Sequence, residues 1–296
     1  MSLIGRGTNG TVDQLNDFIA VKRARSGEDE QADHAHEQKV FRFLKDRPQI
    51  PHLIRCLYQR PNDTFLELAP NGSVAMLLNQ YQIRDGIRVL EVLQHLKPQE
   101  ISRWMRQLCL ATMGLEQVGL THGDIRPANM LLDSNWNLKL SDLDRATRIG
   151  EDIAVMTEPF GRLLSKDDDG DTGTYGKAGV RTDSLAIGSV FYTLLRGHEP
   201  YETESWGTDH FVILGENFQQ REFPPITSSA GDAIISKCWI GEYHSIKELV
   251  AEFPDDTEQH DLVVEEQEFT TLRHLESECR SFIKSGLVDR FKRTKR

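Results

Sequence analysis

The sequence predicts an α+β fold in which a small β-rich lobe is followed by a larger, mainly helical lobe. Short apolar runs at residues 11–12 and 18–21, separated by turn residues, are typical of a β-hairpin, and residues 64–69 have the composition of a further strand. Pro70-Asn71-Gly72 follows that strand and is a strong turn signal. Beyond it the apolar residues recur mainly at helical spacing, so we place the boundary between the lobes at residue 70.

The small lobe also contains one helical pattern. Residues 30–46 carry Val40, Phe41 and Leu44 on one face and charged residues elsewhere, which predicts an amphipathic helix. Pro48 follows directly and favours the end of that helix. We expect His34 and His36, which lie within it, to be solvated residues rather than metal ligands.

The larger lobe contains two clear helices and a hairpin. Residues 99–118 have apolar side chains at helical spacing, and residues 183–195 are almost entirely apolar, which predicts a buried helix. Two apolar runs at 129–132 and 138–140 flank a turn and predict a hairpin. The polar stretch 150–182 is expected to be an extended loop, and its acidic run at 167–171 a solvated part of it that could attract basic substrates.

The composition changes after Pro254. Residues 255–268 hold seven acids and no Lys or Arg, whereas residues 280–296 hold seven cations and one acid. Between them one helical face is formed by Phe269, Leu272, Leu275, Cys279, Phe282 and Ile283, with Gly286 as a C-cap. We therefore divide the chain into a β-rich lobe (1–70), a helical lobe (71–253) and an acidic linker with a basic-ended amphipathic helix (254–296). The pattern leaves open whether this helix docks on its own chain or on a partner.

The overall charge excludes some partners. The chain has 296 residues, with 35 Lys+Arg against 46 Asp+Glu and a net charge of −11. This argues against general binding to nucleic acid or to a membrane surface. No apolar run is long enough to span a bilayer, and no secretory signal is visible. The four cysteines form no CxxC pair, so we expect a reducing compartment, either the cytoplasm or the nucleus.

Two motifs near the N-terminus suggest phosphate binding. Gly5, Gly7, Gly10 and Val12 fit the pattern G-x-G-x-x-G-x-V, whose glycines let backbone N–H groups approach phosphate oxygens. Glycine-rich turns are also common in hairpins, and a following strand argues against a dinucleotide site. Lys22 then ends Ile19-Ala20-Val21-Lys22, close to V-A-I-K, and could reach the α- and β-phosphates if Glu37 held it.

The segment from His122 to Asn129 carries the chemistry. It matches H-R-D-L-x-x-x-N except that Gly123 replaces the arginine, and Asp142-Leu143-Asp144 follows where D-F-G is expected. Phosphoryl transfer needs positioning and charge stabilisation more than covalent chemistry. Asp124 would orient the acceptor hydroxyl and accept its proton. The predicted magnesium ligands are Asn129 and Asp142, and Arg126 would stabilise the γ-phosphate.

On these motifs residues 1–253 resemble the protein kinase superfamily, and more narrowly are similar to fungal kinase-like proteins. The resemblance implies a two-lobed fold with ATP in the cleft, a hinge near Glu67-Leu68-Ala69, and Asp183 as a buried brace for the catalytic loop. It implies ATP contacts at Ile4, Gly5, Gly7, Gly10, Val12, Ala20, Lys22, Glu37, Glu67, Ala69 and Leu131.

Several positions depart from the family pattern. Gly123 removes the arginine that would bind an activation-loop phosphate, and Asp144 adds a carboxylate where the family has glycine. No Ala-Pro-Glu motif stands before residue 181, and its partner arginine is also absent after Cys238-Trp239, where Tyr243-His244-Ser245 stands. Losing both members of a buried ion pair costs less than losing one. The departures therefore put the usual protein-substrate platform in doubt rather than the fold.

We expect an ATP- and Mg²⁺-dependent kinase for Ser or Thr hydroxyls of proteins, independent of activation-loop phosphorylation. Two alternatives stay open. One is a kinase for small hydroxyl compounds, because His-Gly-Asp followed by Asn129 also resembles the catalytic loop of aminoglycoside and choline kinases. The other is a nucleotide-binding pseudokinase scaffold, favoured by Asp144 and the missing platform. A partner for the C-terminal helix is a further expectation.

Overall fold

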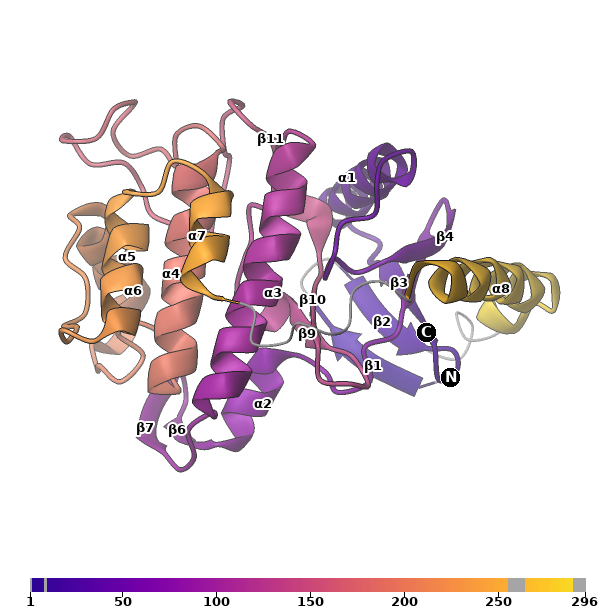
Figure 1. The fold of residues 1–296 in the computed structure, drawn as a ribbon, viewed down its shortest axis with the longest axis horizontal. Coiled ribbons are helices and arrows are strands. Elements are labelled where there is room, and N and C mark those ends of the chain that lie inside the picture. The colour runs from indigo at the N-terminus through magenta and orange to yellow at the C-terminus, as the bar shows by residue number, and fades with distance from the viewer. Residues whose placement is uncertain (1, 8–9, 255–263, 290–296) are drawn as a thin grey trace. The chain divides into compact units, whose positions relative to one another are not determined.

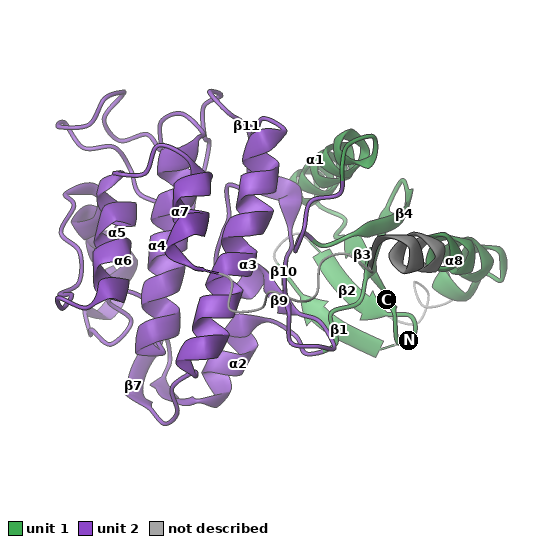
Figure 2. Cartoon of the chain, in the orientation of Figure 1, with its two compact units in different colours: residues 1–48, 54–70, 256–296 green, residues 49–53, 71–255 purple. Residues whose placement is uncertain are grey.

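The computed structural model describes residues 2–7, 10–254 and 264–289, with side chains described from residue 273 in the last range. The chain forms two compact units (Figure 2). Unit 1 comprises residues 1–48, 54–70 and 256–296, and unit 2 comprises residues 49–53 and 71–255. Unit 1 is built on a sheet and unit 2 is mainly helical (Figure 1), which confirms the predicted α+β fold. The domain boundaries predicted at residues 70 and 253 stay a prediction.

Unit 1 contains a five-stranded antiparallel sheet in the order β1-β2-β3-β5-β4. Its strands are β1 (Ser2–Arg6), β2 (Gly10–Gln14), β3 (Ile19–Ala24), β4 (Cys56–Arg60) and β5 (Asp63–Glu67). The predicted hairpin is formed by β2 and β3, where Val12 pairs with Lys22. The predicted helix is α1 (Glu28–Lys45), whose first turn carries three acids that favour its positive N-terminal end.

The C-terminal helix α8 (Val264–Lys284) packs on the same unit. Its Leu275 and Cys279 are buried against Val21 of β3, together with Phe65 of β5. Side chains alternate between the faces of a strand, so Lys22, which contacts α1, and Val21, which contacts α8, point to opposite faces. The sequence left open whether this helix docks on its own chain or on a partner. For residues 273–289 the structure shows that the segment docks on its own chain. The predicted face residues Phe269 and Leu272, and the acidic linker up to residue 263, lie outside the described side chains.

Unit 2 is a bundle of helices with three small strand pairs, of which two are hairpins. The helices are α2 (Val74–Gln80), α3 (Pro98–Gln117), α4 (Val180–Arg196), α5 (His210–Gln219), α6 (Ala230–Ile240) and α7 (Ile246–Glu252). The strand pairs are β6 (Gln82–Asp85) with β7 (Arg88–Val92), β8 (Leu120–Thr121) with β11 (Thr147–Arg148), and β9 (Met130–Leu132) with β10 (Leu138–Leu140). Short 3₁₀ turns lie at Pro127–Asn129, Leu143–Arg145 and Gly207–Asp209. The predicted hairpin at 129–140 is confirmed by β9 and β10.

Helix α4 is the centre of unit 2, as its apolar sequence predicts. Every residue from 182 to 194 is buried, and α4 lies beside α3 and α6 (Figure 1). Gly188 permits the approach of α6, because a Cβ at this position would lie 2.5 Å from Cβ of Cys238. None of the helices in the described ranges is long and apolar enough to cross a membrane.

The segment between β11 and α4 contains no helix or strand, as expected for residues 150–179, whereas residues 180–182 of the predicted loop begin α4. Most of residues 166–174 are exposed, but the segment also has buried anchors. Met156, Phe160 and Leu164 are buried. The backbone N–H of Leu164 donates to the carbonyl of Thr174 at 2.7 Å, and the N–H of Gly173 donates back to Leu164 at 2.9 Å. These paired bonds close a loop over residues 165–172.

Candidate active site

In unit 1 the predicted phosphate-binding lysine has the predicted partner. Nζ of Lys22 lies 2.9 Å from Oε1 of Glu37, which is only 1% exposed. A buried carboxylate is costly unless it is paired, so this ion pair fixes α1 against β3 at the level of the lysine. His34, one helical turn earlier, is buried and lies 3.2 Å from Nε2 of Gln38, so the expectation that it is solvated is wrong.

The glycine-rich segment joins β1 to β2. The N–H of Gly7 donates to the carbonyl of Gly10 at 3.0 Å, which tightens the turn, while Thr8 and Asn9 lie outside the described residues. Gly10 is required by the sheet, because a Cβ there would lie 2.2 Å from the carbonyl oxygen of Arg23. A Cβ at Gly7 would meet no atom within 4 Å, so packing does not explain that glycine.

The other predicted ATP contacts occupy both units. Ile4 is exposed on β1 and Val12 pairs with Gly5 across the hairpin, while Ala20 is buried on β3. Glu67 ends β5, where its Oε1 accepts from the backbone N–H of Arg55 at 3.0 Å, and Ala69 follows within unit 1. Leu131 lies on β9 in unit 2.

In unit 2 the predicted catalytic residues are joined by short hydrogen bonds. Nδ2 of Asn129 donates to both the backbone carbonyl and Oδ2 of Asp124, each at 2.8 Å. Nε of Arg126 donates to the same Oδ2 at 3.1 Å. One carboxylate oxygen of Asp124 is therefore held by two side chains, which fixes the orientation of the other oxygen.

The loop that carries Asp124 is braced from behind by α4. The carboxylate of Asp183 accepts from the backbone N–H of His122 at 3.0 Å and of Gly123 at 3.3 Å. Burial raises the pKa of Asp183, and these two N–H donors oppose the rise. The contacts agree with the bracing role that the resemblance implies.

His122 connects this loop to the residues before Asp142. The N–H of Asp124 donates to Nδ1 of His122 at 3.2 Å, so the ring carries a proton on Nε2, which lies 3.0 Å from the carbonyl oxygen of Ser141. Ser141 in turn donates from its backbone N–H (2.9 Å) and its hydroxyl (3.0 Å) to the carbonyl of Asn129. The two predicted metal ligands, Asn129 and Asp142, are thereby connected through Ser141, the residue before Asp142.

Their chemistry fits magnesium. Asp142 has a left-handed backbone (φ 71°, ψ 77°), which an aspartate tolerates better than most residues. Because Nδ2 of Asn129 is used on Asp124, its Oδ1 is the atom left to bind a cation. Mg²⁺ binds through one or two such oxygens together with substrate phosphates. Among the described residues no group of three or more His, Cys, Asp or Glu has metal-site geometry.

The glycine that departs from the family pattern is demanded by the fold. Gly123 has φ 78°, and a Cβ there would lie 2.4 Å from the carbonyl oxygen of Arg145. Arg145 belongs to the 3₁₀ turn that follows Asp142, in which Asp144 is buried. An arginine at position 123 would therefore require the segment after Asp142 to move.

Sequence reasoning missed Glu199, which follows α4. Burial raises the pKa of Glu199 to about 7, and the Glu202 carboxylate adds to the rise. The guanidinium of Arg126 opposes it, which places Glu199 near the catalytic loop. No motif signals this, because the residue comes close to Arg126 only through the fold.

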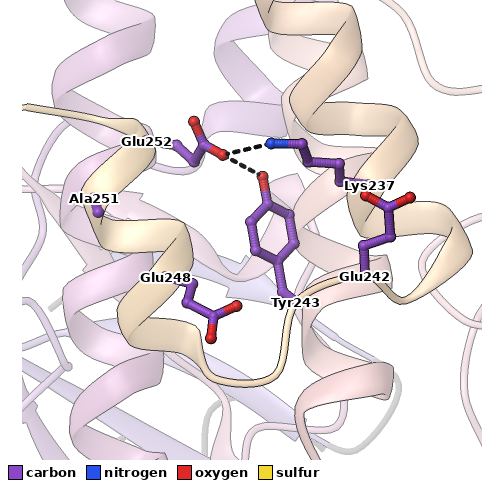
Figure 3. Close-up of a pocket in the computed structure, with 6 residues that line it drawn as sticks. All are labelled: Lys237, Glu242, Tyr243, Glu248, Ala251 and Glu252. Carbon is purple, nitrogen blue, oxygen red and sulfur yellow. Dashed lines mark hydrogen bonds and ion pairs between the residues drawn. The ribbon is translucent and has the colours of Figure 1, made fainter.

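The region of the missing arginine, after α6, contains a different contact. Glu252 accepts from the hydroxyl of Tyr243 at 2.9 Å and pairs with Lys237 at 3.1 Å (Figure 3). Together with Glu242, Glu248 and Ala251, these residues line a pocket of about 480 Å³. None of the predicted site residues lines this pocket, and we assign it no part in the chemistry.

The comparisons with known proteins agree with the geometry. The family model described as "Protein kinase domain" matches residues 1–294. Citron rho-interacting kinase of Rattus norvegicus is 27% identical over 229 residues, which cover 73% of this chain and 10% of that protein. NUAK family SNF1-like kinase 2 of Homo sapiens is 24% identical over 240 residues, 78% of this chain and 36% of that protein. A probable serine/threonine-protein kinase of Corynebacterium efficiens is 26% identical over 129 residues, 43% of this chain and 19% of that protein. The chain thus spans only a minor part of the length of these relatives.

Proposed function

Because the chain belongs to the protein kinase family, we propose that it transfers the γ-phosphate of ATP, with Mg²⁺, to serine or threonine hydroxyls of proteins. The observation that carries this proposal is that Arg126 and Asn129 both donate hydrogen bonds to one carboxylate oxygen of Asp124. The names of the serine/threonine kinases among the distant relatives support the acceptor class.

Asp124 acts on the acceptor. Its Oδ2 is held by Asn129 and Arg126, so Oδ1 is the oxygen that accepts the proton of the attacking hydroxyl. Arg126 also supplies positive charge where the γ-phosphate is transferred. Holding the base in one orientation matters more here than raising its basicity, since phosphoryl transfer depends on alignment.

We assign the nucleotide-binding residues within each unit separately. Asn129 and Asp142 would hold Mg²⁺, which neutralises charge on the phosphates when bound. Lys22, oriented by Glu37, binds the α- and β-phosphates. In unit 1 the glycine-rich segment, β3 and the end of β5 supply further ATP contacts, which are Ile4, Gly5, Gly7, Gly10, Val12, Ala20, Glu67 and Ala69. In unit 2 strand β9 supplies Leu131.

Activity is independent of activation-loop phosphorylation, since Gly123 has no side chain to bind a phosphate. All four cysteines are free thiols, which supports a reducing compartment such as the cytoplasm or the nucleus. The buried carboxylate of Asp144, close to the predicted metal ligands in sequence, favours one competing function, a nucleotide-binding scaffold without transfer.

The test compares phosphoryl transfer by the full chain and by Asp124→Asn, using labelled ATP, Mg²⁺ and a panel of basic proteins and small hydroxyl compounds. We expect Asp124→Asn to lower transfer by at least about 100-fold, while Mg-ATP still raises the melting temperature. Glu151→Gln, which removes an exposed carboxylate from the same unit, is the matched control and should transfer at the wild-type rate.

Three outcomes would contradict the proposal in different ways. Equal rates of phosphoryl transfer by wild type and Asp124→Asn would show that Asp124 is not the base. Transfer to small hydroxyl compounds but to no protein would change the acceptor class. No transfer at all, with a clear Mg-ATP stabilisation, would leave a nucleotide-binding scaffold.

A further inference from the structure

The carboxylate of Asp168 is the most heavily bonded acid in the segment between β11 and α4. Arg162 donates to its two oxygens from Nη1 at 2.7 Å and from Nη2 at 2.6 Å. Ser165 donates to Oδ2 from its backbone N–H at 2.8 Å and from its hydroxyl at 2.9 Å. Nη2 of Arg221, which follows α5, donates to Oδ1 at 2.6 Å. Five donors thus converge on one side chain.

Asp168 is the one residue of the acidic run 167–171 that departs from the expectation of a solvated run, since the other four residues are exposed. The side chains of Asp168 and Arg162 are only 6% and 4% exposed, whereas the neighbours Asp167 and Asp169 are exposed. The hydrogen bonds from Arg162 hold the pKa of Asp168 well below its usual range, against the effect of burial. The carboxylate is therefore charged and paired under all conditions in which the protein is folded near neutral pH.

The contacts of Asp168 join the loop to α5. Gln219, in the last turn of α5, donates from Nε2 to the carbonyl of Leu164 at 2.9 Å, and Arg221 reaches Asp168 two residues later. Leu164 is also the residue whose backbone pairs with Gly173 and Thr174. Asp168 and Leu164 thus hold the two sides of the loop at residues 165–172 against one helix end.

Both ends of the same segment are fixed beside the catalytic loop. At one end Thr147 of β11 pairs with Thr121, the residue before His122. At the other end α4 begins after Gly179 and places Asp183 on the backbone of His122 and Gly123. The segment thus begins and ends at elements that contact the catalytic loop, and none of the residues assigned to catalysis lies within it.

We propose that Asp168 is a positioning residue that holds the acceptor-binding surface in one conformation, in place of the ion pair of the missing Ala-Pro-Glu motif. The inference rests on the proposed function, because it assigns the segment to the protein acceptor. Arg162 and Arg221 supply the opposite charges from within the segment and from the end of α5. Asp168 makes no contact with the nucleotide in this proposal, so its loss affects recognition of the acceptor and not binding of ATP.

The experiment uses Asp168→Asn in the full chain, with Asp169→Asn as the control that removes the same charge from an exposed neighbour. Amide hydrogen exchange is followed at Leu164 and Gly173, whose N–H groups close the loop. We expect Asp168→Asn to speed this exchange at least about tenfold, to raise KM for a protein acceptor at least about fivefold, and to leave KM for ATP within about twofold. Asp169→Asn should match wild type in all three measurements.

Arg221→Gln is the milder variant if Asp168→Asn does not fold, because it keeps the bidentate pair with Arg162 and removes only the bond to the end of α5. Hydrogen exchange needs no activity, so it tests the loop even if wild type proves unable to transfer phosphate. Faster exchange with an unchanged KM for the acceptor would overturn the assignment of the segment to the acceptor. Exchange equal to that of Asp169→Asn would overturn the positioning role itself.

Discussion

The catalytic loop at 122–129 and the segment at 162–174 lie in the same unit, and local and distant contacts hold both, but the distant contacts reach different groups. In the loop the distant Asp183 binds backbone N–H groups, whereas in the segment the distant Arg221 binds a side-chain carboxylate. In the loop, Asp124 is bound by side chains two and five residues away, Arg126 and Asn129. In the segment, Asp168 is bound by Arg162 and Ser165 from nearby and also by Arg221, 53 residues away. Leu164 is bound by Gln219, 55 residues away. The carboxylate of the proposed base is thus held by neighbours in the sequence, whereas the carboxylate of Asp168 joins a local cluster to a distant part of the fold.

This difference has a functional consequence. The contacts of Asp124 with Arg126 and Asn129 depend on the spacing of these residues in the sequence, so they survive changes elsewhere in the chain. Loss of these contacts removes phosphoryl transfer. A non-local contact can be exchanged for another one, as the pair of Asp168 with Arg221 illustrates where Ala-Pro-Glu is missing. We therefore expect substitutions in the loop to abolish transfer and substitutions in the segment to change which acceptors are used.

The largest effect is expected for Asp142→Asn. Asparagine tolerates the left-handed backbone of this position, so the fold should persist, but the metal-ligand charge is lost. Transfer should fall by at least about 100-fold, and the Mg-ATP-induced rise in melting temperature should shrink markedly. Asp124→Asn is the paired control, which should lose transfer but keep that rise. If Mg-ATP raises the melting temperature of Asp142→Asn as much as that of wild type, Asp142 is not a metal ligand.

The two regions also show what a sequence can and cannot predict. The hairpin of β2 and β3, helix α1 and the pair of Lys22 with Glu37 follow from short-range patterns, and the structure places them as expected. The burial of Asp168 and the approach of Glu199 to Arg126 have no such signal, because their partners come from other elements. The need for glycine at position 123 is likewise set by the carbonyl of Arg145, 22 residues later, and no spacing rule connects the two.

The next effect concerns that glycine and tests how tightly the catalytic loop is packed. Gly119→Ala and Gly123→Ala both place a side chain at positive φ, 82° and 78°, but only Gly123 has an atom in the way of a Cβ. We expect Gly119→Ala to lower the free energy of unfolding by about 1 kcal/mol and Gly123→Ala by about 2 to 4 kcal/mol. Urea unfolding measures both. Equal losses would mean that the carbonyl of Arg145 moves aside freely.

A smaller effect, dependent on pH, is expected for Glu199, a non-local neighbour that we assign to the catalytic loop. Burial raises its pKa to about 7, so the folded state holds the proton after the unfolded state has released it. Stability from this group is fully present below the ordinary pKa of a glutamate and is lost as the pH rises to about 7, by up to about 1.4 kcal/mol per pH unit.

Replacing Glu199 by Gln should therefore flatten the stability of the protein between pH 5 and pH 7, as measured by urea unfolding at a series of pH values. Glu202 reinforces the raised pKa, and Arg126 and Arg84 oppose it, so these groups stay unchanged in the variant. Glu204→Gln, which alters an exposed carboxylate nearby, should keep the wild-type pH dependence. A variant at Glu199 that keeps the wild-type slope would contradict the assignment.

The smallest effect is expected from removing phosphate groups. Thr172, Thr174 and Tyr175 are the hydroxyl residues of the segment nearest to α4. In the family pattern a phosphate on such a residue is bound by the arginine at the position of Gly123, and in this chain Arg126 is already bonded to Asp124. Gly123 offers no cation, and the space beside it is filled by the carbonyl of Arg145. The hydroxyl of Tyr175 is already used, since it donates to Oε1 of Glu158 at 3.0 Å, and burial raises its pKa to about 12. Phosphatase treatment should therefore change the transfer rate by less than about twofold, with a kinase that has the usual arginine as the positive control.

A loss of most of the activity would instead show that a phosphate in the segment is bound by other arginines. The first to replace by glutamine would be Arg181 and Arg221, because they lie close enough to Asp168 and to each other to interact.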